Sequence, residues 1–372
     1  MKISIFHANA GHGHRKIAEV IAKAFLKRGL SESEVSVHDA LDFTPAWFRA
    51  FYPWSYFQSV KNTPKLWGWF YDLLDKSNIY KWIFPLRATF NKIIASRLLK
   101  NVLLENPDVI ITTHFLSAQL FADAKKHADL KSKLITVITD FFPHSFWLNE
   151  GTDSYWVMAD ESRDALRKRG IKEELIKPLG IPVEDSFKPT GRKNDYRAKF
   201  KLEQNRFTIL LTSGSFGLGP QSAILDQLSV FSDKVQCIVV CGTNRSLEQE
   251  LRAKAYSFPC LIFGFVDFMP ELMEASDLII AKSGGSTTTE SLAKGIPMVV
   301  LEPIPGQETR NAELLKKRNT SFFLKQPDQI KIILDAIFKD PQLLSLKLNE
   351  INRLAKPHAA DDLVTYALSQ II

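Results

Sequence analysis

The chain has 372 residues, a length at which two domains can each bury a core of their own. Hydrophobic residues make up 45% and charged residues 24%, which are the proportions of a globular protein and exclude a disordered or fibrous chain. The formal net charge of +7 favours acidic partners, such as a nucleotide diphosphate or an anionic membrane surface. Because no block of consecutive basic residues is long enough to suggest a nucleic-acid-binding arm, we expect no nucleic-acid partner.

The chain begins without a recognisable signal peptide, since Met1 and Lys2 lead directly into an apolar strand. No run approaches the ~18–20 apolar residues that a membrane-spanning helix needs, so any membrane contact is expected to be peripheral. The three cysteines, Cys237, Cys241 and Cys260, lack metal-binding spacing and are expected to be reduced and buried. We therefore expect a cytoplasmic protein that associates with the inner face of the cell membrane.

The first forty residues predict a β-α-β unit, with strands over 2–8 and 35–38 and a helix between them. This opening is typical of a doubly wound α/β domain. A glycine-rich loop over 9–14 joins the first strand to the helix and ends at His14. The positive end of the helix dipole would lower the pKa of this histidine, which suits a neutral general base.

Residues 41–90 are unusually aromatic, with 16 of the chain's 41 Phe, Trp and Tyr residues and lysines interleaved among them. Rings mixed with cations are typical of the headgroup zone of an anionic membrane. A packed helical insertion with an aromatic core is one alternative, and single-stranded nucleic acid is another, although no nucleic-acid fold motif accompanies it. We expect a membrane- or lipid-facing region in which Trp54, Trp67 and Trp69 enter the interface.

Polar residues end the next predicted strands, which cover 109–114 and 134–139 after a helix expected over 87–104. Asp140 and His144 follow the second of these strands, at the edge where doubly wound sheets place their chemistry. Asp140 could orient a histidine or act as a base itself, while His144 could reach a phosphate. Zinc is a competing interpretation, but no complete ligand set is visible and no metal is expected.

The second half of the chain repeats the alternation of strands and helices. Strands are predicted over 155–159, 207–212, 235–241, 261–266, 278–281 and 298–301. A polar segment over 189–193 is the expected linker, so the domains are predicted to cover 1–188 and 200–345. A glycine loop, Ser213-Gly214-Ser215, follows the strand at 207–212 and could contact phosphate.

The most informative stretch covers residues 281–311, where a buried strand stops at a Gly-Gly turn and a helix follows. Ser286 or Thr287 is the expected N-cap of that helix, and a helix N-terminus of this kind can bind phosphate. Glu290, early in the helix, either complements the dipole or accepts hydrogen bonds from ribose hydroxyls. The polar segment 305–311 follows the next strand, where open α/β sheets place ligands.

The sequence SGGSTTTES at 283–291, followed by GIPMVVLEPIPGQETRNAELL at 295–315, resembles the donor site of the monogalactosyl- and monoglucosyl-diacylglycerol synthases. These are GT-B glycosyltransferases, related to the peptidoglycan enzyme that adds N-acetylglucosamine to a lipid intermediate. The GHGH at 11–14 resembles the N-terminal motif of the same family. The resemblance implies two doubly wound Rossmann-like domains that face an interdomain cleft, with the last helix, over 357–372, packing back on the first domain.

The resemblance also implies roles for individual residues. The diphosphate would bind at the Gly-Gly turn, ribose at the helix glutamate, uracil at a backbone edge, and the sugar at the Gln-Glu pair. The implied donor site comprises Ser213, Gly214, Ser215, Phe265, Val266, Ser283, Gly284, Gly285, Ser286, Thr287, Glu290, Gln307, Glu308 and Asn311. The implied catalytic residue is His14 or Asp140, and the acceptor and membrane contacts are Gly13, His144, Trp147, Trp54, Trp67 and Trp69.

The function expected from the resemblance is inverting transfer of a hexose from a UDP-sugar to a membrane lipid, with diacylglycerol as the acceptor. The UDP-sugar is a substrate and no cofactor is expected, since no D-x-D triplet suggests a metal. Three alternatives remain at this point. They are transfer of N-acetylglucosamine to a polyprenyl-diphosphate-linked sugar, epimerisation of UDP-N-acetylglucosamine at carbon 2, and nucleotide-sugar binding without catalysis.

Overall fold

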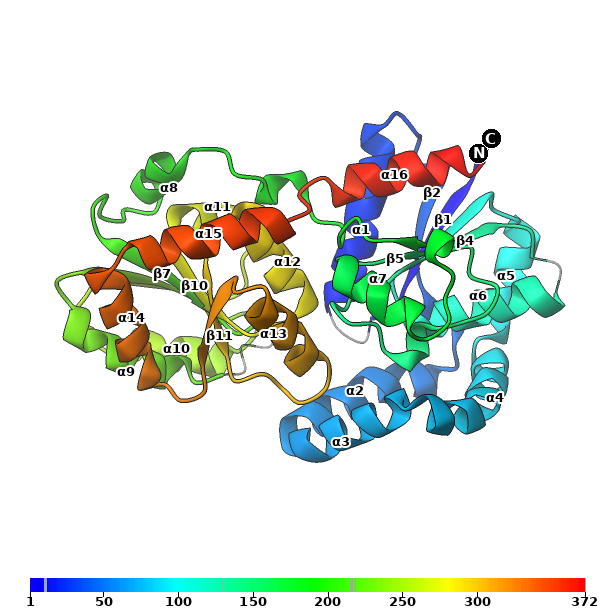
Figure 1. The fold of residues 1–372 in the computed structure, drawn as a ribbon, viewed down its shortest axis with the longest axis horizontal. Coiled ribbons are helices and arrows are strands. Elements are labelled where there is room, and N and C mark those ends of the chain that lie inside the picture. Colours follow the sequence, from blue (N-terminus) through cyan, green and yellow to red (C-terminus); the bar gives the residue numbers. More distant parts are fainter. Residues whose placement is uncertain (10–11, 129, 215–216, 218, 372) are drawn as a thin grey trace. The chain divides into compact units, whose positions relative to one another are not determined.

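The chain forms two compact units in the computed structural model, which describes residues 1–9, 12–128, 130–214, 217 and 219–371 (Figure 1). Unit 1 consists of Met1–Glu184, Ile304–Arg310 and His358–Ile372. Unit 2 consists of Asp185–Pro303 and Asn311–Pro357. The chain therefore passes from unit 1 into unit 2 a few residues before the polar segment at 189–193.

Unit 1 is built on a six-stranded sheet with the order β2-β1-β3-β4-β5-β6, in which all neighbours pair in parallel. The strands are β1 Ile3–His7, β2 Val35–Asp39, β3 Val109–Thr112, β4 Lys133–Val137, β5 Ser154–Trp156 and β6 Ile176–Lys177. Strands β1 and β3 are buried along their whole length, as expected of a parallel sheet with helices on both faces.

The helices of unit 1 surround this sheet (Figure 1). They are α1 His12–Lys27, α2 Ala46–Asn62, α3 Pro64–Asp75, α4 Ser77–Ile94, α5 Ser96–Glu105, α6 Phe115–His127, α7 Asp160–Arg167 and α16 Ala359–Ser369. The C-terminal helix α16 packs across α1, and the Arg28 guanidinium donates a hydrogen bond to Thr365 Oγ1 over 3.0 Å.

The single helix expected over 87–104 is wrong, because the chain breaks at Ala95 between α4 and α5. In a straight helix Ile94 and Leu98 would lie on one face. The break lets Ile94 pack beside Phe48 of α2, whereas Leu98 packs in the cluster that covers β1 and β3. Two separate hydrophobic clusters therefore determine where the helix ends.

The aromatic region at 41–90 folds mainly into α2, α3 and the first part of α4. Within the described ranges, no helix combines the length and the apolar character needed to cross a bilayer. The region is therefore a helical insertion between β2 and β3 of unit 1.

Unit 2 carries a second parallel sheet, with the order β12-β11-β10-β7-β8-β9. The strands are β7 Phe207–Thr212, β8 Val235–Val240, β9 Cys260–Phe263, β10 Leu278–Ala281, β11 Met298–Leu301 and β12 Ser321–Leu324. Counted from β7, this is the Rossmann strand order 3-2-1-4-5-6 read from one edge. The two sheets confirm the predicted α/β class with two doubly wound domains.

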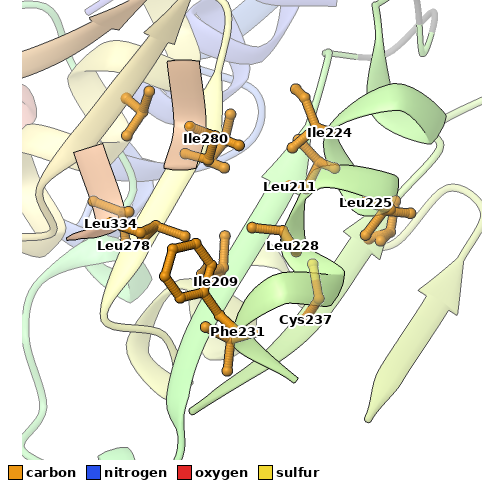
Figure 2. Close-up of a cluster of buried hydrophobic side chains, with 14 of the residues drawn as sticks. Ile209, Leu211, Ile224, Leu225, Leu228, Phe231, Cys237, Leu278, Ile280 and Leu334 are labelled. Atoms are coloured by element: carbon orange, nitrogen blue, oxygen red, sulfur yellow. The ribbon is translucent and has the colours of Figure 1, made fainter. Parts of the chain in front are cut away.

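The core of unit 2 forms where its central strands pair (Figure 2). Ile209 of β7 lies in register with Leu278 of β10, and Leu211 lies in register with Ile280. The surrounding helices are α8 Lys193–Lys199, α9 Gln221–Leu228, α10 Arg245–Ala253, α11 Met269–Ala275, α12 Gly285–Lys294, α13 Gln307–Lys317, α14 Gln329–Lys339 and α15 Gln342–Leu354. Leu228 of α9 closes the cluster from the helix side (Figure 2).

A buried ion pair fastens the start of unit 2 to α11 and α12. The Lys294 ammonium donates to Glu274 Oε2 over 2.8 Å and to the carbonyl oxygens of Ser186 and Lys188 over 3.0 and 2.9 Å. Glu274 Oε1 accepts from the Thr190 backbone N–H and hydroxyl, each over 2.8 Å. Burial would raise the pKa of Glu274, but the bonds from Lys294 and Thr190 hold it below its ordinary value.

Replacing Lys294 by Met should lower the free energy of unfolding of unit 2 by about 3–5 kcal/mol, because the buried Glu274 carboxylate loses its charged partner. Urea unfolding followed by circular dichroism measures this change. Arg353→Met is the matched control, since the Arg353 side chain is 72% exposed in its pair with Glu350. The control should change the free energy by less than about 0.5 kcal/mol, and equal effects of both substitutions would contradict the structural role of Lys294.

Candidate active site

The first part of the site lies where the strand order of the unit 1 sheet reverses, between β1 and β3. Gly13 and His14 occupy the first turn of α1, the helix that follows β1 in the chain. His14 Nδ1 lies 2.7 Å from the Thr113 carbonyl oxygen and 3.1 Å from Thr139 Oγ1. Because a carbonyl oxygen only accepts, Nδ1 carries the proton and Nε2 keeps its lone pair. His14 is therefore held as a neutral imidazole with one basic nitrogen.

Burial lowers the pKa of His14 to about 4, against the opposing effect of the Thr113 carbonyl. The ring meets His114 edge-on, with 4.8 Å between centroids. His114 is itself buried, and its Nδ1 accepts from the Leu116 backbone N–H at the start of α6, so it caps a helix. Among the described residues, no three His, Cys, Asp or Glu side chains gather as metal ligands would.

Asp140 follows β4 in a loop and is only 6% exposed. The Trp147 indole N–H donates to Asp140 Oδ2 over 3.0 Å, and the Gln307 side-chain amide donates to Oδ1. Burial raises the pKa of Asp140 to about 6, although the Trp147 bond, the Arg310 charge and the Gln307 bond oppose this rise. The carboxyl group can therefore gain or lose a proton close to neutral pH.

Two residues that the sequence placed on the acceptor side lie inside unit 1 instead. His144 Nε2 donates to the Tyr71 carbonyl oxygen over 2.9 Å, and Nδ1 accepts from the Phe146 backbone N–H over 3.1 Å. Both ring nitrogens are thus occupied within the protein, and the expectation that His144 reaches a phosphate is wrong in this structure. Trp147 is 1% exposed, and its contact is with Asp140 rather than with a membrane.

The exposed apolar side chains of the helical insertion form what we call the aromatic surface. It comprises Trp47, Phe51, Trp54, Leu66, Trp69, Phe70, Trp82, Leu86, Phe90 and Ile93. Trp67 does not belong to it, because this ring packs against Tyr56 and Tyr71 inside unit 1. Successive helical residues are rotated by about 100°, so Trp67 and Trp69 cannot face the same side of α3. The prediction that both rings enter one membrane interface is therefore wrong for Trp67.

The second part of the site lies where the strand order of the unit 2 sheet reverses, between β7 and β10. Ser283 and Gly284 follow β10, and α12 begins at Gly285. Gly284 is the N-cap, in extended conformation, and as a glycine it offers no side chain of its own to cap the helix. The expectation of Ser286 or Thr287 as N-cap is wrong, because the helix starts earlier and takes both residues into its first turn.

This start of α12 has the properties of an anion site. The first-turn N–H groups of a helix have no partner within the helix, and here they lie at the positive end of the dipole of α12. The Asn311 amide donates to the Ser283 carbonyl oxygen over 2.8 Å and so fixes the backbone of the turn. Glu290 lies buried one turn further along α12.

The remaining predicted donor residues lie at strand ends of unit 2 or in segment 304–310. Ser213 and Gly214 follow β7, whereas Ser215 lies outside the described residues. Phe265 and Val266 follow β9, and the Phe265 side chain is exposed. Gln307 and Glu308 form the first turn of α13 and belong to unit 1, where Glu308 Oε2 accepts from the Ile304 backbone N–H over 2.9 Å.

Sequence reasoning missed three residues of the site. Thr113 and Thr139 orient His14, and Arg310 lies within the electrostatic reach of Asp140. The two threonines lie just beyond β3 and β4, within the strands expected over 109–114 and 134–139, so strand ends were the available signal. Arg310 stood in the polar segment after β11, but nothing in the sequence showed that it pairs with carboxylates more than 200 positions earlier.

Both halves of the chain match known protein families. Residues 14–183 match the family described as "Monogalactosyldiacylglycerol (MGDG) synthase". Residues 208–359 match the "Glycosyltransferase family 28 C-terminal domain". Together with two doubly wound sheets and a glycine turn at the start of α12, these matches define a GT-B glycosyltransferase. Residues 14–183 therefore belong to the MGDG synthase family, and residues 208–359 belong to the family 28 glycosyltransferases.

Individual relatives agree with this class. A Bacillus cereus protein named "Processive diacylglycerol beta-glucosyltransferase" is 27% identical over 372 residues, covering 99% of this chain and 94% of the relative. Among solved structures, MurG of Acinetobacter baumannii has a TM-score of 0.63 at 17% identity, with 99% of this chain and 100% of that chain covered. Anabaena Alr3699/HepE in complex with UDP has a TM-score of 0.60 at 15% identity, with the same coverage.

The fold alone does not separate transferases from epimerases. UDP-GlcNAc 2-epimerase from Neisseria meningitidis, bound to UDP-GlcNAc, has a TM-score of 0.62 at 14% identity and covers 99% of this chain and 100% of its own. That score is close to the score of MurG. The family matches, rather than the fold, therefore assign this chain to the glycosyltransferases.

Proposed function

We propose that the protein transfers a hexose from a UDP-sugar to a hydroxyl group of a membrane lipid, diacylglycerol, with inversion at the anomeric carbon. The observation that carries this proposal is the match of residues 14–183 to the MGDG synthase family. The name of the Bacillus cereus relative supports a diacylglycerol acceptor. In this proposal the UDP-sugar is a substrate, and no cofactor or metal takes part.

The donor would bind mainly to unit 2. Its diphosphate would accept hydrogen bonds from the first-turn N–H groups of α12 and from the hydroxyls of Ser286 and Thr287. The Glu290 carboxylate would accept from the ribose hydroxyls, and the backbone at Phe265 and Val266 would hold the uracil edge. The Gln307 and Glu308 side chains would contact the hexose, and the glycine loop at Ser213 and Gly214 would add phosphate contacts.

In the chemical step, the oxygen of the lipid hydroxyl attacks the anomeric carbon and the bond to the β-phosphate oxygen breaks. The bonding pair leaves with UDP, whose charge the N–H groups of α12 stabilise. The hydroxyl proton passes to Asp140, whose pKa of about 6 suits a general base near neutral pH. His14 is the alternative base, because its Nε2 keeps a lone pair, but its pKa of about 4 makes it the weaker base.

The acceptor would approach over the aromatic surface. Exposed rings such as Trp54 and Trp69 would enter the interface, and lysines in the same insertion would meet lipid phosphates. In this proposal the enzyme would bind the inner face of the cell membrane as a peripheral protein. An anionic membrane is thus a proposed partner, in addition to the UDP-sugar and the lipid acceptor.

The function can be tested by incubating the purified chain with radiolabelled UDP-glucose, UDP-galactose or UDP-N-acetylglucosamine and vesicles that contain diacylglycerol. We expect a labelled glycosyl-diacylglycerol with one of the first two donors. Vesicles with a polyprenyl-diphosphate-linked sugar serve as the competing acceptor. Product only with that acceptor, or epimerised UDP-N-acetylglucosamine without transfer, would reject the proposal.

The identity of the base can be read from the dependence of kcat/KM on pH, which reports the free enzyme. With Asp140 as base, activity should fall as the pH drops through about 6, because the protonated carboxyl cannot accept a proton. With His14 as base, activity should persist until about pH 4. Substituting the base should lower kcat by ~10²–10⁴-fold. If Asp140→Asn retains wild-type kcat while His14→Ala loses activity, His14 is the base.

The membrane proposal predicts that Trp54→Ala combined with Trp69→Ala weakens binding to anionic vesicles by at least about tenfold, since two rings no longer enter the interface. Sedimentation with vesicles measures this binding. Added salt should weaken the binding of the wild type without abolishing it, because only the lysine contribution is screened. Ile332→Ala, an exposed apolar residue of α14, is the control and should bind like the wild type. Equal binding by the double variant would refute the role of these rings.

A further inference from the structure

Helix α3 has two faces with different surroundings. On its outer side, Leu66, Trp69 and Phe70 are exposed and contribute to the aromatic surface. On its inner side, the helix backbone approaches segment 304–310 so closely that a Cβ atom on Gly68 would lie 2.3 Å from Pro305 Cβ. The backbone carbonyl carbon of Pro305 would be only 3.2 Å away. Glycine at position 68 is therefore what allows the segment to lie on α3.

An arginine fastens the same segment to the end of α3. Arg310 Nη1 donates to Asp75 Oδ2 over 2.6 Å, and Nη2 donates to Asp72 Oδ1 over 2.8 Å. The guanidinium also lies over the Tyr71 ring, 5.0 Å from its centroid. One side chain thus makes three contacts with a single helix, and the planar guanidinium is the group that can bridge two carboxylates in this way.

The carboxylate at the centre of this contact is itself held firmly. Both oxygens of Asp75 accept from Arg169, each over 2.8 Å, and Oδ1 also accepts from the Ser145 backbone N–H over 2.6 Å. Burial would raise the pKa of Asp75, but the bond and charge of Arg169, with His144 and Arg310, hold it below its ordinary value. Asp75 is therefore ionised at neutral pH and provides a fixed anchor for Arg310.

The spacing along α13 connects this anchor to the site. Gln307 and Arg310 are three residues apart in the first turn, so their side chains lie on neighbouring positions of one face. Gln307 donates to Asp140, while Arg310 bonds to α3. Fixing Arg310 therefore also fixes the direction from which the Gln307 amide meets the carboxylate.

We propose that Arg310 is a positioning residue for Asp140, which it serves by holding Gln307 against the carboxylate and by supplying a nearby positive charge. The proposal rests on the proposed function, in which Asp140 accepts the proton of the lipid hydroxyl. Gly68 and Asp75 of α3 position Arg310 and segment 304–310. Gly68 leaves room for Pro305, and Asp75 accepts a hydrogen bond from Arg310.

The charges around Asp140 predict the direction in which its pKa changes when Arg310 is replaced. Its pKa is raised chiefly by burial, and the positive charge of Arg310 lowers it. The other groups that face it are the neutral donors of Trp147 and Gln307, together with the phenols of Tyr71 and Tyr56, whose own pKa values are raised by burial and by the Asp140 charge. Removing the Arg310 charge should raise the pKa of Asp140, so the base should become protonated at a higher pH.

The test is the dependence of kcat/KM on pH for wild type, Arg310→Gln, Arg310→Lys and Arg167→Gln, with the active UDP-hexose and diacylglycerol vesicles. For Arg310→Gln we expect the acidic fall in activity to begin at higher pH, with a loss of about fivefold at pH 8.5, as for Gly68→Ala, and a loss of more than about tenfold at pH 6. Arg310→Lys retains the charge, so its acidic fall should coincide with that of the wild type. Arg167→Gln removes a charge from the exposed side of α7 and should leave the profile unchanged.

A second variant disturbs the contact between α3 and segment 304–310 without changing any charge. Gly68→Ala places a methyl group where Pro305 lies, so the segment must move away from α3. Alanine is the better helix former by about 0.5–1 kcal/mol, so lost activity could not be explained by a weakened helix. We expect kcat to fall at least about fivefold at pH 8.5, with UDP affinity in calorimetry within about twofold of the wild type.

The outcomes separate the two proposals. Absence of transfer by the wild type would refute the proposed function itself. An active wild type whose pH profile is unchanged in Arg310→Gln would refute the positioning role and leave the function standing. Loss of UDP affinity in Arg310→Gln would also overturn the role, since it would assign Arg310 to donor binding.

Discussion

Placing the carboxyl group of Asp140 in a nearly water-free environment is the constraint on which the rest of the site depends. Removing a carboxylate from water costs several kcal/mol unless hydrogen bonds and charge replace the lost hydration. Trp147 and Gln307 each donate to one oxygen, and Arg310 adds positive charge. This replacement is incomplete, which is why the pKa of Asp140 stays near 6. The same incompleteness gives the group the basicity that a proton acceptor needs at neutral pH.

Parallel sheets explain why the polar residues collect where they do. All strands of such a sheet end at one edge, and a ligand site forms where the strand order reverses. In unit 1 this reversal brings the start of α1 next to the end of β3, so that His14 meets Thr113. In unit 2 it brings the turn at Ser283 and Gly284 beside the end of β7. Buried apolar runs bounded by glycine are visible in the sequence, and β7 and β10 were predicted to the residue. The order of the strands in each sheet, which decides which strand ends become neighbours, is not visible in the sequence.

The predictions that failed share one physical cause. The sequence shows which side chains are present but not the direction in which each one points. The aromatic insertion was evident, but the side on which Trp67 points was not, and this ring packs inward while Trp69 is exposed. His144 and Trp147 were located correctly at the end of β4, yet both are used inside the protein. Arg310 was hidden for a related reason, because its partners on α3 lie far away in the chain and only folding brings them together.

Helix α3 brings these observations together, because its two faces serve two different environments. A helix of 12 residues held by hydrogen bonds along its length behaves as a rigid rod over that distance. Trp69 and Phe70 on one side and Gly68 and Asp75 on the other are therefore joined by one helix and not by a loop. The apolar side is exposed, whereas the inner side is occupied by segment 304–310. If lipid binds to the outer side, it acts on the same helix that sets the position of Gln307, and through it the environment of Asp140.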